Sequence, residues 1–351
     1  MPIVYLVAGG TGGHINAALS VGEEFQNEFD VRYISGLRYL DKRLFKGQNI
    51  THIQSQPLRT KNPLKLAINI FKNLFSFVCL FFLFVFERPI AVIGAGGYVC
   101  GPTLMAAKIL FIPIFIIEQN AIMGLTNRLL AKFSNLIFLN FKETKGVKNT
   151  HKAKVVGNPI RKNIRFEKPV DYSELNLLVF GGSLGAQQIN QVMYKLIEKD
   201  FSFKLNVFHQ VGKDNLSQTK TSSNVSYEQV EYIEDMQSAY AKSHVILARS
   251  GASTVSELRV VKRPTIIIPF PHATDNHQYY NALNLKSESS FPVEILDYNK
   301  SIDELTEAVY DALESLKPEV SNIIERSSLD NSSKDSASAV IKREVLAYVR
   351  H

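Results

Sequence analysis

Two glycine-rich turns carry the residue types that bind phosphate groups. One spans residues 9–13 (GGTGG) after the apolar run 3–7, and the other spans 181–185 (GGSLG) after the run 177–180. A strand, a glycine turn with a hydroxyl residue and a helix start form an anion site, because free backbone N–H groups meet the helix dipole there. Glycines can also serve only tight strand–helix packing. The recurrence of the turn in both halves of the chain favours phosphate binding.

The second turn also fits the nucleophile elbow G-x-S-x-G of serine hydrolases. Asp235 and His272 follow Ser183 in the order that a catalytic triad would need. The first turn has Thr11 at the equivalent place, which favours a phosphate role shared by both turns. A serine hydrolase therefore stays as an alternative.

A nicotinamide-binding fold is excluded by the same turns. The dinucleotide fingerprint needs G-x-G-x-x-G and an acidic residue at the end of the second strand. The first turn lacks the third glycine, and its second strand ends in Ser35-Gly36. The corresponding strand of the second half ends in His209-Gln210, so both halves fail the test.

Apolar runs alternate with helical stretches along the whole chain, in two series that join near residues 157–172. This pattern predicts parallel sheets covered on both faces. With 351 residues the chain is long for one hydrophobic core. We expect domains at 1–160 and 161–351, with the last helix able to pack back on the first. The runs are 3–7, 31–34, 91–93, 114–117, 136–139 and 154–156, then 177–180, 206–208, 244–247, 265–268 and 293–296.

The composition indicates the class of protein and its compartment but does not identify a binding partner. Apolar residues make up 45% and charged residues 21%, a normal globular balance. Cys79 and Cys100 offer no disulfide framework and no zinc-ligand cluster, which fits a reducing cytoplasm, and the N-terminus has no signal-peptide pattern. The net charge of +7 suits nucleic acid, anionic lipid or phosphorylated ligands, but it is spread along the chain.

Six segments together resemble the undecaprenyldiphospho-muramoylpentapeptide β-N-acetylglucosaminyltransferase (MurG) family, in the family's order, from residue 3 to about residue 285. The segments are AGGTGGHINAALSVGEEF (8–25), GAGGYVCGPTLMAAK (94–108), EQNAIMGLTNRLLAKF (118–133), GNPIR (157–161), FGGSLGAQQIN (180–190) and RSGASTVSELRVVKRPTIIIPFPHATDNHQYYNA (249–282).

The resemblance implies the α/β GT-B architecture, two facing Rossmann-like domains with parallel sheets and an interdomain cleft. It implies inverting transfer of N-acetylglucosamine from UDP-GlcNAc to the C4 hydroxyl of MurNAc in lipid I, which gives lipid II for peptidoglycan. No DxD triplet occurs, so we expect no metal and no cofactor. The expected location is peripheral, on the cytoplasmic face of the bacterial cell membrane. Anionic lipid and other cell-wall synthesis proteins are expected partners, and nucleic acid is not.

The resemblance also implies roles for individual residues. His14 is the candidate general base for the acceptor hydroxyl, because an imidazole titrates near neutral pH; the alternative is that it only caps a helix or shapes the turn. Glu257 is expected on the ribose hydroxyls, Ile233 on uracil through its backbone, and Gln278 on the sugar. The full set expected at UDP-GlcNAc is Thr11, Gly12, Gly13, Asn120, Arg161, Ser183, Ile233, Ala252, Ser253, Thr254, Val255, Ser256, Glu257 and Gln278.

Two further functional classes stay open beside the transferase. One is another nucleotide-sugar transferase of the same architecture. The other is a lipid-surface scaffold with a decayed active site, against which the intact donor motifs argue.

The segment 64–86 is the most apolar of the chain. Polar residues at helical spacing predict one polar face in its first half: Lys65, Asn69, Lys72, Asn73 and Ser76. The 14 uncharged residues between Lys72 and Glu87 fall short of the roughly 20 that span a bilayer. A core helix and a helix in the membrane surface both remain. Lysines at 61, 65 and 72 beside phenylalanines at 71, 75 and 82 favour part core, part contact with an anionic leaflet.

Overall fold

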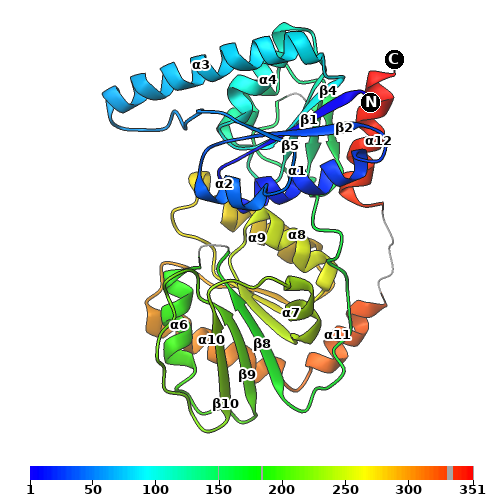
Figure 1. The fold of residues 1–351 in the computed structure, drawn as a ribbon. Helices are drawn as coiled ribbons and strands as arrows, with labels where there is room; N and C mark the ends of the chain where they lie inside the picture. The colour runs from blue at the N-terminus through cyan, green and yellow to red at the C-terminus, as the bar shows by residue number, and fades with distance from the viewer. Residues whose placement is uncertain (149, 183–184, 330–334, 351) are drawn as a thin grey trace. The chain divides into compact units, whose positions relative to one another are not determined.

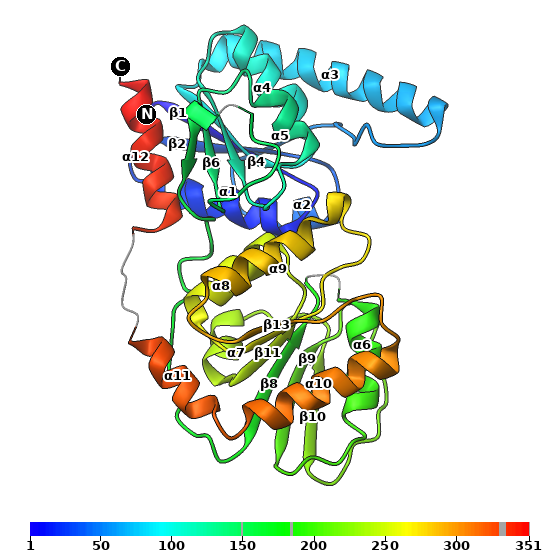
Figure 2. The same cartoon turned by 180° about the vertical axis from the view of Figure 1, so that it is seen from behind.

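The computed structural model describes residues 1–148, 150–182, 185–329 and 335–350. The chain divides into two compact units (Figures 1 and 2). Unit 1 comprises Met1–Arg161 together with Lys334–His351, and unit 2 comprises Lys162–Ser333. The end of the chain thus returns to the unit in which the chain begins.

Unit 1 is built on a parallel sheet with the strand order β3-β2-β1-β4-β5-β6-β7. The order reverses between β1 and β4, so the loops after these two strands diverge to opposite faces and leave the usual ligand position of such sheets. The strands are β1 (Ile3–Ala8), β2 (Asp30–Ser35), β3 (Ile50–His52), β4 (Ala91–Gly96), β5 (Ile114–Glu118), β6 (Leu136–Leu139) and β7 (Ala153–Val155).

Helices cover both faces of this sheet, because alternate strand residues point to opposite sides. Val4 and Leu6 join the core under α1 and the C-terminal helix α12, whereas Tyr5 and Val7 join the core under α3 and α4. The described helices are α1 (Gly12–Phe25), α2 (Tyr39–Leu44), α3 (Pro63–Glu87), α4 (Cys100–Ile109), α5 (Leu125–Leu130), the short η1 (Thr150–Lys152) and α12 (Ala337–Val349). Ser338 of α12 also contacts Ser20 of α1, with 2.8 Å between the two Oγ atoms.

Unit 2 has a second parallel sheet, with the order β10-β9-β8-β11-β12-β13 and its reversal between β8 and β11. The two parallel sheets confirm the predicted α/β class. The strands are β8 (Leu175–Phe180), β9 (Leu205–Gln210), β10 (Val225–Val230), β11 (Val245–Ala248), β12 (Thr265–Ile267) and β13 (Val293–Ile295). The helices are α6 (Gln187–Leu196), α7 (Met236–Lys242), α8 (Ala252–Val261), η2 (Thr274–Asn276), α9 (His277–Glu288), α10 (Ile302–Leu316) and α11 (Val320–Ser328).

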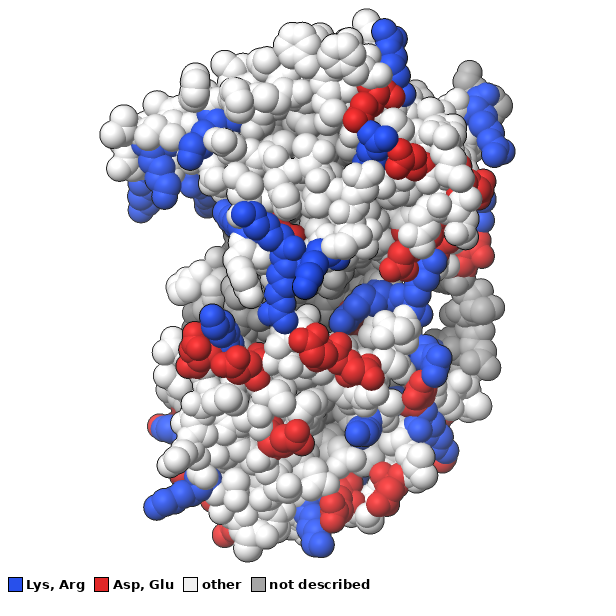
Figure 3. Space-filling model, in the orientation of Figure 1, with Lys and Arg blue, Asp and Glu red and all other residues white. Residues whose placement is uncertain are grey.

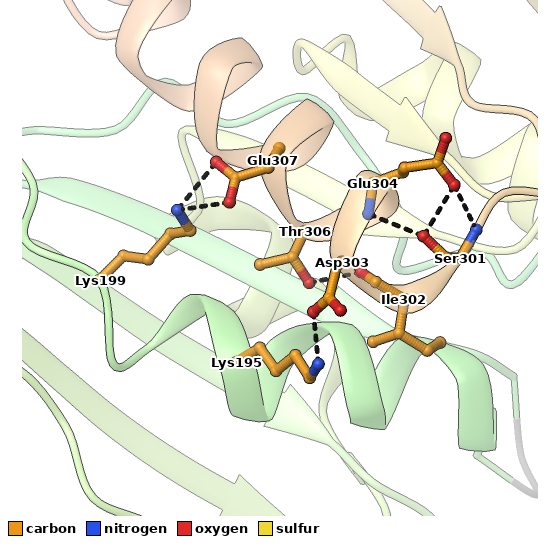
Figure 4. Close-up of polar contacts among 8 residues, drawn as sticks. All are labelled: Lys195, Lys199, Ser301, Ile302, Asp303, Glu304, Thr306 and Glu307. Atoms are coloured by element: carbon orange, nitrogen blue, oxygen red, sulfur yellow. Dashed lines mark hydrogen bonds and ion pairs between the residues drawn. The ribbon is translucent and has the colours of Figure 1, made fainter.

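Charged contacts fix the start of α10 against α6 (Figure 4). The Ser301 side chain accepts from the Glu304 amide, and the Glu304 carboxylate accepts from the Ser301 amide, a reciprocal capping box. Lys195 of α6 pairs with Asp303, and Lys199 pairs with Glu307 at 2.8 Å. This arrangement holds Ile302, the first residue of α10, beside the carboxyl ends of the strands.

Helix α3 presents its surfaces in an unexpected way. Its buried positions are Asn69, Ser76, Leu80 and Phe84. The Asn69 amide donates to the Pro57 carbonyl at 2.8 Å, so this polar stripe faces the protein. The polar face predicted for the first half of this helix is thus turned toward the protein, where the Asn73 amide donates to the Gln56 carbonyl at 2.9 Å and Ser76 is buried. The outward side is apolar: Leu64, Ile68, Ile70, Phe71, Leu74, Phe75, Val78, Phe82 and Phe86 are exposed.

Candidate functional site

A pocket of about 670 Å³ opens at the carboxyl ends of β8, β11 and β12 in unit 2. Its position is the reversal point of the sheet, where ligands of open α/β folds bind. The second glycine turn forms one wall, and α6, α9 and the start of α10 contribute the others. The lining residues are Gly181, Gly182, Gly185, Ala186, Gln187, Gln188, Gln191, Arg249, Phe270, Pro271, Gln278 and Ile302.

Arg249 is a buried cation on the wall of this pocket. One guanidinium nitrogen donates to the carbonyls of Ile268 and Pro269 at 2.9 and 2.7 Å, and to the Gln188 side chain at 3.2 Å. Burial lowers its pKa to about 10, so the group stays charged at neutral pH. Its Nε is buried without a hydrogen-bond partner in the described chain. Sequence reasoning quoted Arg249 within a motif but gave it no role.

Helix α8 begins beside Arg249 with an uncapped N-terminus. Gly251 occupies the N-cap position and offers no side-chain bond to the first turn, and no acidic residue lies there. The first-turn N–H groups of Ala252, Ser253 and Thr254 therefore suit an anionic ligand. The Ser253 hydroxyl is likewise buried with no partner among the described residues. Val255 lies in the core, and the Ser256 hydroxyl donates back to the Ala252 carbonyl at 2.9 Å.

Glu257 lies one turn further along α8 and is buried. Its carboxylate accepts a hydrogen bond from the Tyr240 hydroxyl at 2.8 Å. A buried carboxylate needs donors, and a vicinal diol supplies two. This environment excludes the alternative that Glu257 is only a solvent-facing helix charge.

Gln278 contributes an oriented amide to the pocket. Its side-chain oxygen accepts from the Phe270 amide at 3.0 Å, so its NH₂ group is the side-chain donor that remains for a ligand. The Gln278 carbonyl accepts from the Ser250 hydroxyl at 2.8 Å, which ties α9 to the start of α8.

Gln210 links the glycine turn to Ile233. It donates to the Gly182 carbonyl at 2.7 Å and accepts from the Ile233 amide at 2.9 Å. Because the Ile233 amide is bonded to Gln210, the Ile233 carbonyl is the backbone group that suits a contact with uracil. Ile233 lines a second cavity, of about 550 Å³, rather than the pocket around Arg249. Ser183, the expected diphosphate contact, lies outside the described residues.

Unit 1 has the first glycine turn at the corresponding point of its own sheet. Thr11 is the N-cap of α1, and its hydroxyl accepts from the His14 amide at 3.3 Å. Gly12 and Gly13 form the first turn of that helix. His14 Nδ1 lies 3.3 Å from the Gly9 carbonyl oxygen. In the tautomer whose Nδ1–H donates a hydrogen bond to this carbonyl, Nε2 is the nitrogen of the neutral ring that can accept a proton.

The loop after β4 closes tightly over this turn. Gly97 has a φ of +92°, and a Cβ added there would lie 2.1 Å from the Gly9 carbonyl oxygen. The Gly10 amide donates to the buried Asp41 carboxylate at 3.0 Å. The Arg38 guanidinium stacks 4.8 Å from the centre of the Tyr98 ring, which itself lies against Gly10.

Asn120 follows β5 in unit 1 and is held by its neighbour. Its backbone amide and side-chain amide both donate to one oxygen of Glu118, at 2.9 and 3.4 Å. The other Glu118 oxygen accepts from Gly124 and Asn127, each at 2.9 Å. Burial raises the pKa of the Glu118 carboxyl, and these donors oppose the rise. Glu118 therefore orients Asn120, a role that sequence reasoning missed.

The expected site residues thus fall into two groups. In unit 2 the structure places Gln278 in the same pocket as Arg249, whereas the residues 252–257 of α8 follow Arg249 in the chain but do not line that pocket. In unit 1 it brings Thr11 and His14 onto one turn, while Arg161 is the last residue of the unit's first segment.

Asp235, the aspartate that the serine hydrolase alternative would need, has a structural role. Asp235 is the N-cap of α7, and its carboxylate accepts from the Ser238 amide and hydroxyl at 3.1 and 2.6 Å. This arrangement explains the aspartate without a catalytic triad.

Family comparisons cover both units. Residues 4–139 match the glycosyltransferase family 28 N-terminal domain, and residues 176–339 match the glycosyltransferase family 28 C-terminal domain. A relative from Myxococcus xanthus is 36% identical over 80% of this chain and 76% of its own. One from Francisella tularensis is 37% identical over 82% of each chain. Both are named UDP-N-acetylglucosamine--N-acetylmuramyl-(pentapeptide) pyrophosphoryl-undecaprenol N-acetylglucosamine transferase.

Solved structures agree on the fold. The crystal structure of Acinetobacter baumannii MurG matches with a TM-score of 0.78 at 27% identity, covering 99% of this chain and 100% of that one. The calicheamicin glycosyltransferase CalG4 matches with a TM-score of 0.68 at 14% identity, covering 100% and 99%, which shows the fold alone. The predicted GT-B class, with one Rossmann-like sheet per unit, is confirmed.

Proposed function

The chain belongs to glycosyltransferase family 28, and from that premise we propose that it makes lipid II. It transfers N-acetylglucosamine from UDP-GlcNAc to the MurNAc C4 hydroxyl of lipid I, in peptidoglycan synthesis. The observation that carries this proposal is the pocket of unit 2, where the buried Arg249 lies with the second glycine turn and the Gln278 amide. Relatives at 36–37% identity bear the name of this activity, which supports the choice of substrates.

Unit 2 supplies the donor side of the reaction. Arg249 and the first turn of α8 stabilise the diphosphate, whose negative charge grows as the bond to the sugar breaks. Glu257 accepts hydrogen bonds from the ribose hydroxyls, and the Gln278 amide donates to the donor. Preorganised donors of this kind can take the leaving-group charge without a metal ion.

Unit 1 supplies the acceptor side. His14 Nε2 removes the proton of the C4 hydroxyl as its oxygen attacks the anomeric carbon, and UDP leaves from the opposite face. The anomeric configuration therefore inverts. The Gly9 carbonyl favours the required tautomer by accepting from Nδ1. The glycine turn at Thr11, Gly12 and Gly13 presents backbone N–H groups to the acceptor diphosphate.

Product analysis tests this proposal. Purified protein is incubated with UDP-GlcNAc and a lipid I analogue, and the products are analysed by mass spectrometry and by NMR of the new glycosidic bond. We expect one added N-acetylhexosamine in a β-1,4 link. A product that forms with UDP-GlcNAc and a different acceptor, but not with lipid I, would identify another nucleotide-sugar transferase.

We further propose that the outward side of α3 lies on the cytoplasmic leaflet of the cell membrane. By length and composition, α3 is the one helix of the described chain that could cross a membrane, and 22% of its most apolar 18-residue window is buried. Asn69 and Ser76 face the protein, whereas four phenylalanines, Phe71, Phe75, Phe82 and Phe86, are exposed, the reverse of an ordinary surface helix. Figure 3 shows this projecting helix as a mostly uncharged surface with basic side chains along one edge.

Packing favours a helix that lies on the leaflet over one that crosses it. Leu80 and Phe84 belong to the core beneath the sheet, and Asn69 is bonded to the loop before the helix. At its end, Glu87 pairs with Arg32 of β2 at 2.6 Å. Crossing a bilayer would require breaking all of these contacts, whereas lying on its surface retains them.

Vesicle binding tests the membrane contact. Replacing Lys61, Lys65 and Lys72 by Gln should weaken binding to anionic vesicles, because each lysine contributes about 1 kcal/mol near a charged leaflet. The loss should be greatest at low salt. Replacing Lys220, Lys286 and Lys300 of unit 2 by Gln is the matched control. Equal binding by both triple variants and the native chain at every salt concentration would mean that the lysines beside α3 are ordinary surface.

A further inference from the structure

Arg38, in the loop after β2, places a cation beside the first glycine turn. Its guanidinium carbon lies 4.8 Å from the centre of the Tyr98 ring, and its Nη1 lies 3.7 Å from the point that a Cβ on Gly10 would occupy. The next residue along the turn, Thr11, is the N-cap of α1. The charge of Arg38 therefore lies near the backbone N–H groups that start α1.

The Tyr98 ring holds this guanidinium in place. Its Cε1 lies 3.2 Å from a Cβ added to Gly10, and its hydroxyl oxygen lies 2.4 Å from a Cβ added to Gly36. A side chain at either glycine would displace the ring, so two glycines from different loops make room for it. The ring is thus fixed on the glycine turn, and Arg38 stacks on the ring.

Arg38 is not neutralised by the carboxylate nearest to it in the sequence. Asp41, three residues further on, is buried, and its Oδ1 accepts from the Gly10 amide at 3.0 Å. Among the described residues Arg38 forms no hydrogen bond or ion pair, and its side chain is exposed. A guanidinium that stacks on a ring keeps its N–H groups along its edge, so they are open to a ligand.

The chemistry of this corner matches a diphosphate better than a single phosphate. The N-terminus of a helix offers backbone N–H groups to one phosphate group. A second phosphate beside it requires a further donor, and a guanidinium can bind two phosphate oxygens at once through parallel hydrogen bonds. Arg38 supplies such a donor next to the start of α1.

We propose that Arg38 binds the diphosphate of the acceptor and selects acceptors linked through a diphosphate over those linked through one phosphate. The inference rests on the proposed function and deepens it, because it assigns the recognition of the acceptor linkage to one side chain. The stacked Tyr98 ring orients the guanidinium, and the donor nucleotide in unit 2 is independent of it.

Steady-state kinetics with two acceptors test the proposal. Both carry MurNAc on the same short prenyl chain, one through a diphosphate and the other through a single phosphate. Arg38→Gln should raise the KM for the diphosphate acceptor about tenfold, through loss of charge-assisted hydrogen bonds. It should leave the KM for the monophosphate acceptor and the KM for UDP-GlcNAc nearly unchanged. Arg38→Lys keeps the charge without the planar fork, so we expect a smaller rise of about threefold.

Lys46→Gln is the matched control, because Lys46 follows α2, is exposed and carries the same charge. It should change neither acceptor KM. An unchanged KM for the diphosphate acceptor in Arg38→Gln would overturn the proposal. So would an equal rise for both acceptors, which would mean that Arg38 only supports the fold of the turn, or an equal rise in Lys46→Gln, which would mean a general effect of surface charge.

Failure of this inference is distinguishable from failure of the proposed function. Transfer by the native chain that is insensitive to Arg38→Gln would remove the role of Arg38 and leave the activity in place. Absence of transfer by the native chain to both acceptors would contradict the proposed function and this inference with it.

Discussion

The glycine turns of the two units occupy the same place in their sheets but differ in what surrounds them. In unit 1 the Gly10 amide is bonded to Asp41, and Gly97 closes directly over the Gly9 carbonyl. In unit 2 the turn borders a pocket of about 670 Å³. A Cβ added to Gly182, on the side of this turn that lines the pocket, would meet nothing within 4 Å, whereas one added to Gly185 would lie 2.1 Å from the Val211 carbonyl oxygen.

This difference indicates that the two units use the same glycine turn for different purposes. The turn of unit 2 is open on its pocket side, which leaves room for a nucleotide diphosphate beside Arg249. The closed turn of unit 1 holds one histidine in a defined orientation and presents a small set of N–H groups. The same strand–turn–helix sequence can thus hold a leaving group in one unit and a base in the other, and the variants below test that division.

The largest expected effect belongs to His14. His14→Ala should lower kcat by about 10²–10⁴ if its ring accepts the proton of the acceptor hydroxyl. His52 is the matched control in unit 1, because its Nδ1 also lies close to a carbonyl oxygen, that of Gly36, at 2.7 Å. Steady-state kinetics on a soluble acceptor decide the matter. A raised KM at constant kcat would reduce His14 to a residue that shapes the turn.

Glycines that allow close backbone contact should come next. Gly97→Ala in unit 1 and Gly185→Ala in unit 2 each place a Cβ 2.1 Å from a carbonyl oxygen. We expect each to lower transfer about 100-fold, since a displacement near 1 Å in an active site has that effect. Gly101→Ala, which meets nothing within 4 Å, should be neutral. Activity retained by Gly97→Ala would show that the closed turn is not needed.

Glu257 should show a smaller effect, confined to the donor. Glu257→Gln is expected to raise the KM for UDP-GlcNAc about 10–100-fold, because hydrogen bonds to a charged group contribute about 1.5–3 kcal/mol. Tyr240→Phe removes one partner of the carboxylate and keeps the charge, so it separates support of Glu257 from ribose binding. An unchanged donor KM in Glu257→Gln would remove the ribose assignment.

The smallest expected difference between the two units is in the loss of stability at low pH, which two buried histidines of unit 2 should cause. Burial lowers the pKa of His209 to about 3 and that of His244 to about 4, below the ordinary value near 6.5. The unfolded chain therefore binds protons first, so stability is full above about pH 6.5 and falls as the pH drops toward 4. The expected loss is about 1.4 kcal/mol per pH unit per histidine. His244 also accepts from the Asn176 amide at 3.0 Å, a bond that protonation would break.

Urea unfolding followed by circular dichroism at pH 7 and pH 5 measures this effect. The variants His209→Gln and His244→Gln should each lose less stability between the two pH values than the native chain does. Identical losses in all three proteins would place the acid sensitivity elsewhere.

The sequence was sufficient for the two parallel sheets and for most motifs, because β-branched runs and glycine turns act over short distances. The structure buries Glu257, which excludes a solvent-facing helix charge, and its contact with the donor stays a prediction. Sequence reasoning missed Arg249 and Glu118 as supports, because their roles depend on carbonyls and amides brought together by the fold. It predicted that Asn69 and Ser76 share a face of α3 but left open where that face points, because helical spacing does not show which side of a helix meets the protein.

Isothermal titration with UDP tests the division of labour between the two turns most directly. Each turn has one arginine beside it, Arg249 in unit 2 and Arg38 in unit 1. Arg249→Gln should weaken UDP binding by about 10–100-fold, through the loss of charged hydrogen bonds to the diphosphate. Arg38→Gln should leave UDP binding unchanged. UDP binding that survives Arg249→Gln, or that falls equally in both variants, would contradict the assignment of the nucleotide to unit 2.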